Sequence, residues 1–187
     1  VATQTEIYDY LRLLFARIGR TFCHICGTEV KKDSPESSAT DILETLAEGT
    51  RFYLVFPVQE FHHKDAESPN KTKNTEDNKR IGDLMSFLGK GFSRLYRNGE
   101  IIELQKPEDY KFEDFDETYV LVDRLKSDKS IRQRLVDSLE ICFRETGNAV
   151  ILSADLQDAG VSLKFSDKFI CKKDGTQFEV PEPHLFS

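Results

Sequence analysis

The sequence contains no run of about 18 apolar residues, and no charged segment leads into an apolar one near residue 1. The first feature marks a membrane-spanning helix and the second a secretory signal peptide, so we expect neither here. The four cysteines agree with a reducing compartment, because disulfide frameworks belong to oxidising ones. We therefore predict a cytoplasmic protein with no membrane contact.

An excess of basic residues is also missing. Lys and Arg number 26 against 33 Asp and Glu, which gives a net charge of -7. Binding to duplex nucleic acid relies on clustered Lys and Arg that neutralise phosphates. The composition thus argues against a general grip on nucleic acid, and any DNA contact would be local or made by other parts of a larger protein.

Motifs of the common enzyme classes are absent as well. The chain has no Walker A glycine loop, no Ser-His-Asp order and no H-E-x-x-H. Without a phosphate-cradling glycine loop and its lysine, we expect these residues alone neither to hydrolyse ATP nor to bind it tightly. His62, His63 and the carboxylates of residues 113–117 are interpreted as solvated side chains.

Half of a metal site is present. Cys23 and Cys26 have the spacing that lets two thiolates hold one tetrahedral ion, and a structural zinc site normally has four protein ligands. Cys171 is a third candidate ligand, but Asp174 stands where its partner cysteine would be. We therefore expect zinc to be absent or substoichiometric, because losing half of the ligands removes most of the binding free energy. The alternative is that the pair are ordinary thiols in a turn.

The chain is long enough to bury a core, with 187 residues of which 39% are hydrophobic. A Thr-x-x-Glu capping box at residues 3–6 and helical spacing of apolar residues predict a helix from about 4 to 17. A short helix follows and ends at Gly49. A further helix is expected from about 76 to 88, after a polar loop near residues 60–80.

Strand patterns begin at residue 50. They predict strands at 51–58 and 117–125, two more in "NAVILSA" and "VSLKF", and a hairpin whose turn is Asn98-Gly99. A helix from Ser130 to Gly147 carries Cys142 on its buried stripe. We predict an α+β fold: a small antiparallel or mixed sheet with packed helices, plus flanking helical segments and a cysteine knuckle.

The hairpin turn also predicts which residues of its two strands face each other. With the turn at its tip, the expected cross-strand pairs are Arg97 with Glu100, Leu95 with Ile102 and Arg94 with Glu103.

Several segments together carry a family resemblance. "TEIYDYLRLLFARIG" followed by the C-x-x-C, then "VDRL", "RLVDSLE", "FSDKFIC" and "EPHLFS" in that order, resemble the UvrA family. These are the damage-recognition ATPases, of the ABC class, in the bacterial UvrABC excinuclease. The resemblance implies an internal piece of a longer protein, with the first ATP-binding motif upstream and the second zinc-ligand pair downstream. The intact protein would bind ATP, zinc and damaged duplex DNA, and form a homodimer.

The resemblance also implies a division of the chain. Residues 1–49 would belong to the first nucleotide-binding module, residues 50–157 would form the UvrB-binding domain, and residues 158–187 would return and open a degenerate zinc finger. The implied function is recruitment of UvrB in nucleotide excision repair. The alternatives are a zinc-dependent DNA-binding module, favoured only if a basic face and a closed metal site occur together, and a free-standing enzyme, which the missing motifs disfavour.

Arg94 and Arg124 match two arginines that the resemblance places at the UvrB interface, and Arg97 is a third candidate. Arginine suits this role because its planar fork binds a carboxylate through two parallel hydrogen bonds. The purely structural alternative is ion pairing between strands, for Arg94 with Glu103. Cys23, Cys26 and Cys171 remain the candidate metal ligands, and zinc is the candidate cofactor of these residues.

Overall fold

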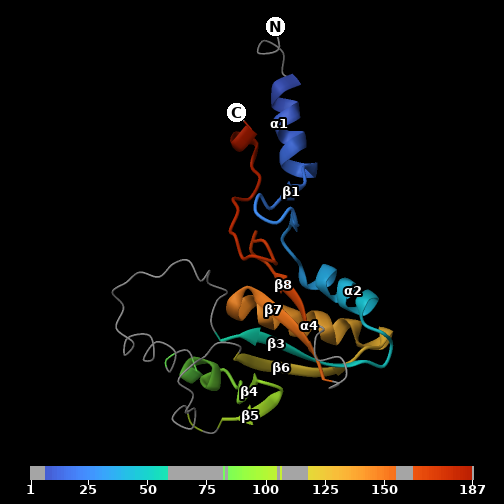
Figure 1. Cartoon of the computed structure of the whole chain (residues 1–187), viewed down its shortest axis with the longest axis vertical. Helices are drawn as coiled ribbons and strands as arrows, with labels where there is room; N and C mark the ends of the chain where they lie inside the picture. The colour runs from blue at the N-terminus through green and yellow to red at the C-terminus, as the bar shows by residue number, and fades with distance from the viewer. Residues whose placement is uncertain are drawn as a thin grey trace. The chain divides into compact units, whose positions relative to one another are not determined.

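The computed structural model describes residues 7–58, 82, 84–104, 106, 118–154 and 162–186 (Figure 1). The chain forms two compact units, each described by itself: the knuckle unit, Val1–Lys32 with Lys168–Ser187, and the sheet unit, Asp33–Asp167. The sheet unit thus begins before residue 50 and ends after residue 157, the bounds expected for the UvrB-binding domain. The assignment of UvrB binding to residues 50–157 stays a prediction.

The sheet unit is built on six antiparallel strands in the order β5-β4-β6-β3-β7-β8. This confirms the α+β prediction. The strands are β3 (Arg51–Pro57), β4 (Arg94–Arg97), β5 (Glu100–Glu103), β6 (Tyr119–Lys126), β7 (Asn148–Ser153) and β8 (Ser162–Ser166).

The hairpin of β4 and β5 has the predicted register. All three expected pairs are present, and Arg94 lies opposite Glu103. Asn98 and Gly99 have φ values of 50° and 85°. Positive φ at both central residues is the geometry of a two-residue hairpin turn whose twist matches that of the strands.

Helix α4 (Arg132–Thr146) covers one face of the sheet, and α2 (Pro35–Thr45) packs against α4. Leu135, Leu139 and Cys142 are fully buried in the core beneath α4. Burial raises the pKa of the Cys142 thiol, and this cysteine behaves as the small hydrophobe that the helix stripe predicted. The helix ends at Gly147, which has φ 72° and donates its N–H to the carbonyl of Phe143.

Two short 3₁₀ turns also lie among the described residues. A 3₁₀ turn, η3 (Lys129–Ile131), precedes α4 and is capped by the Asp128 side chain, which accepts a hydrogen bond from the Ser130 N–H. In the knuckle unit the 3₁₀ turn η5 (Pro183–Phe186) lies near the end of the described residues, after Cys171 and Asp174.

The remaining predicted features are covered only in part. Residues 84–89 are helical, whereas the start of the helix expected from about 76, the capping box at residues 3–6, His62, His63 and residues 113–117 lie outside the described residues. Among the described helices, none combines the length and the apolar character needed to cross a lipid bilayer.

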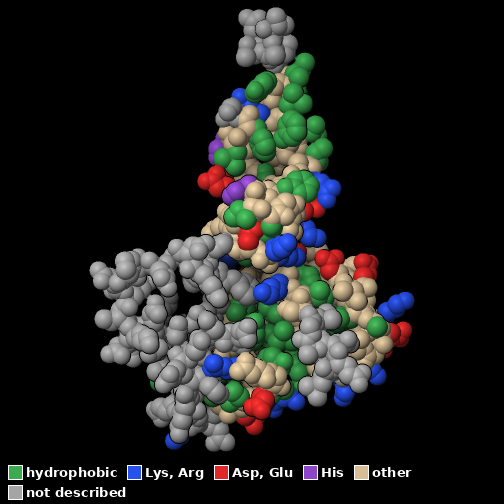
Figure 2. All heavy atoms as spheres, viewed as in Figure 1, with side chains coloured by type: hydrophobic (Ala, Val, Ile, Leu, Met, Phe, Trp, Pro, Cys, Tyr) green, Lys and Arg blue, Asp and Glu red, His purple; other side chains and the backbone are tan. Residues whose placement is uncertain are grey.

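The knuckle unit contains α1 (Ile7–Ile18) and the two-stranded hairpin of β1 (Thr21–Phe22) and β2 (Glu29–Val30). The apolar side chains of α1 are largely exposed, and they contribute to the green surface in the upper part of Figure 2. Phe15 makes one ring contact, with Phe186 of η5, at 6.0 Å between centroids. Little of the apolar surface of α1 is therefore covered by the described residues of this unit.

Candidate metal centre and arginine face

Two turns of matching sequence build the candidate metal centre. Residues 23–28 read CHICGT and residues 171–176 read CKKDGT. In each turn the first residue donates its N–H to the carbonyl of the threonine, at 2.8 Å in both, and accepts from the glycine N–H, at 2.9 and 2.8 Å. Gly27 and Gly175 have φ 70° and 75°, where a glycine avoids the strain that a side chain would cause. The two turns therefore present equivalent ligand positions.

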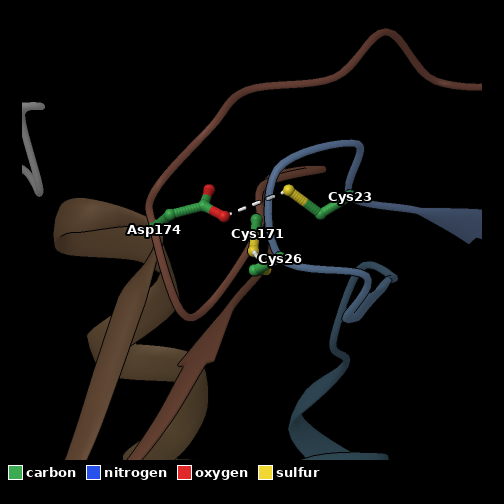
Figure 3. A group of neighbouring side chains, drawn as sticks. All are labelled: Cys23, Cys26, Cys171 and Asp174. Carbon is green, nitrogen blue, oxygen red and sulfur yellow. Dashed lines mark hydrogen bonds between the residues drawn. The ribbon is translucent and has the colours of Figure 1, made fainter.

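The four ligand side chains of these turns converge on one point (Figure 3). Cys23 and Cys26 come from the N-terminal knuckle, and Cys171 and Asp174 from the C-terminal one. The Sγ atoms of Cys26 and Cys171 are 3.4 Å apart, and the Cys23 thiol donates to Asp174 Oδ2 at 3.1 Å. All four ligand atoms lie within 4.8 Å of one another, and Cys23 and Cys171 are buried.

A threonine orients the carboxylate of this group. Asp174 Oδ1 accepts from the Thr176 N–H at 2.9 Å and from its hydroxyl at 2.6 Å, which leaves Oδ2 directed at the cysteines. Hydrogen bonds from Cys26, Thr176 and Cys23 hold the pKa of Asp174 well below its usual range. Burial raises the pKa of Cys171 to about 11. The charged form of the carboxylate and the neutral form of the buried thiol are therefore favoured in this group.

The geometry fits a tetrahedral metal ion. Ligands at about 2.3 Å from a central ion would lie roughly 3.8 Å from one another. The separations of 3.1 and 3.4 Å and the 4.8 Å limit for the whole group bracket that value. The sequence predicts only half of a metal site, whereas the structure places Cys171 and Asp174 where a second pair of ligands would lie. The sequence contains a signal for this second pair. The pattern C-x-x-C-G-T at residues 23–28 recurs as C-x-x-D-G-T at residues 171–176, with Asp174 at the position that corresponds to Cys26.

Arg94 and Arg124 lie on one face of the sheet, opposite the face that α4 covers. Arg94 and Tyr96 are two residues apart in β4, so their side chains share a face of the sheet. Arg124 lies directly opposite Tyr53 of β3 and shares that face with it. Both tyrosines pack on a small cluster separate from the α4 core. Arg94 forms an exposed ion pair with Glu103 at 3.5 Å, as its hairpin register predicted.

The guanidinium of Arg124 is exposed, and within the described part of the chain it makes no hydrogen bond or ion pair. The neighbouring Asp123 points to the other side of the sheet, where its carboxylate accepts two hydrogen bonds from Arg134 of α4 at 2.8 and 2.7 Å. Arg97 is two residues from Leu95 in β4, so it shares the face of Leu95, which belongs to the core under α4. The Arg97 side chain is half-buried. The structure therefore groups Arg94 with Arg124 and places Arg97 on the opposite face.

The order of the segments along the chain defines a class of domain. An α+β unit is inserted in sequence between the two segments that form the knuckle unit, and the knuckle unit carries the ligand cluster. The family model described as the UvrA interaction domain matches residues 35–155, and the chain belongs to that family.

Curated relatives match over the whole chain. UvrABC system protein A of Streptomyces coelicolor is 35% identical over 190 residues, that of Deinococcus radiodurans 34% over 192, and that of Thermus thermophilus 32% over 190. Each alignment covers 100% of this chain but only 17 to 18% of the relative, so the chain spans about a sixth of the length of these proteins.

Proposed function

We propose that the sheet unit is a protein-interaction domain that recruits UvrB in nucleotide excision repair. The observation that carries this proposal is the grouping of Arg94 and Arg124 on one face, although 30 residues separate them in sequence. The match to the UvrA interaction domain and the names of the relatives support it. As part of a longer protein, these residues would act in the cytoplasm beside regions that bind ATP and damaged DNA and form a homodimer.

Arginine pairs on a sheet face suit binding to a protein that presents carboxylates. Each guanidinium can form two parallel hydrogen bonds with one carboxylate, and partial loss of water strengthens them. Arg124 makes no ion pair with a described residue. Arg94 would give up its exposed ion pair with Glu103 to bind a carboxylate of UvrB, and the loss of an exposed ion pair costs little free energy. We propose that these residues contribute recognition and no ATP hydrolysis of their own.

Calorimetry with purified UvrB tests this function. Arg94→Glu and Arg124→Glu should each weaken binding by about 2 to 5 kcal/mol, because reversal leaves a partner charge unpaired. Lys129 is exposed and belongs to η3, which leads into α4, and not to a strand of the sheet, so Lys129→Glu is a control with the same charge change. Melting temperature is measured for all variants. Unchanged affinity with lost stability would make the arginines structural, and no binding by the unmodified chain would overturn the function.

We also propose that Cys23, Cys26, Cys171 and Asp174 hold a structural Zn²⁺. A thiolate-rich donor set in tetrahedral arrangement favours zinc, and a site closed by four protein ligands leaves no position for a substrate. A bound ion would supply a cross-link between the two knuckles and balance the charge of the ionised ligands. Elemental analysis of the purified chain tests this proposal. About one zinc per chain is expected, in place of the absent or substoichiometric zinc predicted from the sequence, because four ligand atoms converge where the sequence indicated half a site.

A further inference from the structure

We infer that the contact for UvrB extends beyond the two arginines, across a basic face with a tyrosine pair at its centre, and that it accepts an acidic protein surface bearing an apolar side chain. This inference rests on the proposed function and specifies the chemistry of the partner. The basic tyrosine face consists of Arg51, Tyr53, Arg94, Tyr96, Arg124, Lys126 and Lys164.

The strand register places the charged members on this face. Side chains that lie directly opposite each other in neighbouring strands share a face. Arg51 pairs with Lys126, Lys164 pairs with Val150, and Val150 pairs with Val55 of the tyrosine-bearing cluster. All five cations are exposed, and Glu103 is the one acidic residue among the described strand positions of this face. A strongly basic face thus occurs in a chain whose net charge is -7.

The centre of the face is apolar. Tyr53 and Tyr96 belong to strands on either side of β6, yet their ring centroids are only 5.5 Å apart, with a tilt of 46° between planes. The rings therefore lean toward each other across β6 and belong with the buried Leu121 to one cluster. Both rings stay half-buried, and burial raises the pKa of the Tyr96 hydroxyl.

The dimensions of the face suit a protein contact. Continuing the register of β4 and β6 by one pair sets Arg94 beside Leu121, so Arg94 and Arg124 are separated by about 10 Å along the strand direction. Lys164 lies four strands away from Arg94, at about 19 Å across the sheet. A patch of about 10 by 19 Å covers roughly 190 Å², about a quarter of the ~800 Å² that each partner contributes to a standard protein interface, so it is of a size to form the central part of one.

The tyrosine pair with cations around it has the layout of a protein interface in which hot-spot residues lie at the centre and charged residues at the rim. Half-buried tyrosines contribute most to binding when a partner side chain removes their remaining water, whereas rim charges mainly accelerate association. A nucleic acid strand would instead need ring faces on which bases can stack. Tyr53 and Tyr96 turn toward each other, so an acidic protein surface is the better match.

The test uses the full chain and UvrB, measured by calorimetry and by association kinetics at two salt concentrations. Lys164→Glu should raise Kd about 3- to 10-fold through slower association, with the effect reduced at high salt, because it is a rim charge. Tyr96→Thr should raise Kd about 30-fold or more, as expected for a central residue. Tyr96→Phe retains the ring and should bind within a factor of about two of the unmodified chain, since ring contact dominates. Lys129→Glu should leave Kd unchanged.

The outcomes separate this inference from the function on which it rests. If Arg94→Glu and Arg124→Glu weaken UvrB binding while Lys164→Glu and a folded Tyr96→Thr do not, the extended face is refuted and the proposed function stands. Lys164 is exposed on β8, so its variant decides the question even if Tyr96→Thr fails to fold. If the unmodified chain binds an oligo-dT strand through these residues and not UvrB, the face is a nucleic-acid site and both proposals fail.

Discussion

The two units of this chain differ in the size of the apolar core that their described residues bury. The sheet unit buries a continuous core of large apolar side chains between α4 and the sheet, with Phe52, Phe56, Leu135 and Leu139 essentially inaccessible to water. In the described part of the knuckle unit, the buried apolar cluster consists only of Cys23, Val30 and Cys171, with partly buried neighbours. Two of these three are candidate metal ligands.

This contrast shows how a small unit can be ordered without a large core. Apolar burial cannot offset the conformational entropy of so few residues, so small units usually need a cross-link such as a structural metal. With a metal bound, the four converging ligand atoms would provide such a cross-link between two segments far apart in sequence. We therefore propose that a metal stabilises the knuckle unit, whereas the apolar core stabilises the sheet unit.

The largest effect is expected for Cys171→Ser. This change removes a buried ligand, and structural zinc sites contribute about 10 to 16 kcal/mol of apparent binding free energy that depends on a complete ligand set. Elemental analysis should find zinc lost or strongly reduced in this variant. Cys142→Ala is the matched control, because that cysteine lies in the other unit, and it should keep the zinc content of the unmodified chain. Retained stoichiometric zinc in Cys171→Ser would contradict the assignment.

A core substitution sharpens the comparison from the other side. Leu139 of α4 is fully buried in the core between this helix and the sheet. Leu139→Ala should therefore lower the unfolding free energy of the sheet unit by about 2 to 5 kcal/mol, because apolar burial is lost and a cavity is left behind. Urea unfolding followed by circular dichroism measures the change. Zinc content should stay as in the unmodified chain, and a loss of zinc would show that the two units are not stabilised independently.

A smaller effect is expected where a threonine supports the centre. Thr176→Val removes the hydroxyl that donates to Asp174 Oδ1 and should lower zinc affinity about 10- to 100-fold, the usual cost of losing a residue that orients a ligand. Competition with a chromogenic chelator measures the affinity. Thr176→Ser keeps the hydroxyl and should bind zinc like the unmodified chain. Equal affinity in the valine and serine variants would show that the carboxylate needs no such support.

The smallest effect concerns a polar contact at the edge of the core. Arg134 donates two hydrogen bonds to the largely buried carboxylate of Asp123, which also accepts from Ser138 at 3.2 Å. Arg134→Ala should destabilise the sheet unit by about 1 kcal/mol, since Asp123 keeps its other partners and the arginine is exposed. Lys129→Ala, at an exposed position close by, should change the unfolding midpoint less. A larger loss than for Leu139→Ala would contradict this ranking.

Local chemistry explains which features could be predicted from the sequence. The hairpin register followed from Asn98-Gly99, and the end of α4 followed from Gly147, because each depends on backbone preferences of one or two residues. The order of the six strands required knowledge of packing between distant segments. The helix predicted from about 4 begins in the described residues at Ile7.

The metal centre could be predicted only in half. Spacing identified Cys23 and Cys26, but their partners lie almost 150 residues later, and sequence distance gives no information about that approach. Asp174 was interpreted as a missing cysteine, whereas the structure shows a carboxylate that its own turn holds toward the thiols. The tyrosine pair could not be predicted, because Tyr53 and Tyr96 lie 43 residues apart in sequence and only the strand order brings their rings together.

Hydrogen exchange of the zinc-loaded chain, with and without a metal chelator, tests the central comparison most directly. Mass spectrometry of peptides should show that chelation removes protection from residues 21–30 and 169–178, where the two knuckles lie, and leaves β3, β6 and β7 protected. Protection retained in the knuckles after the metal is gone, or lost from both units together, would contradict the account.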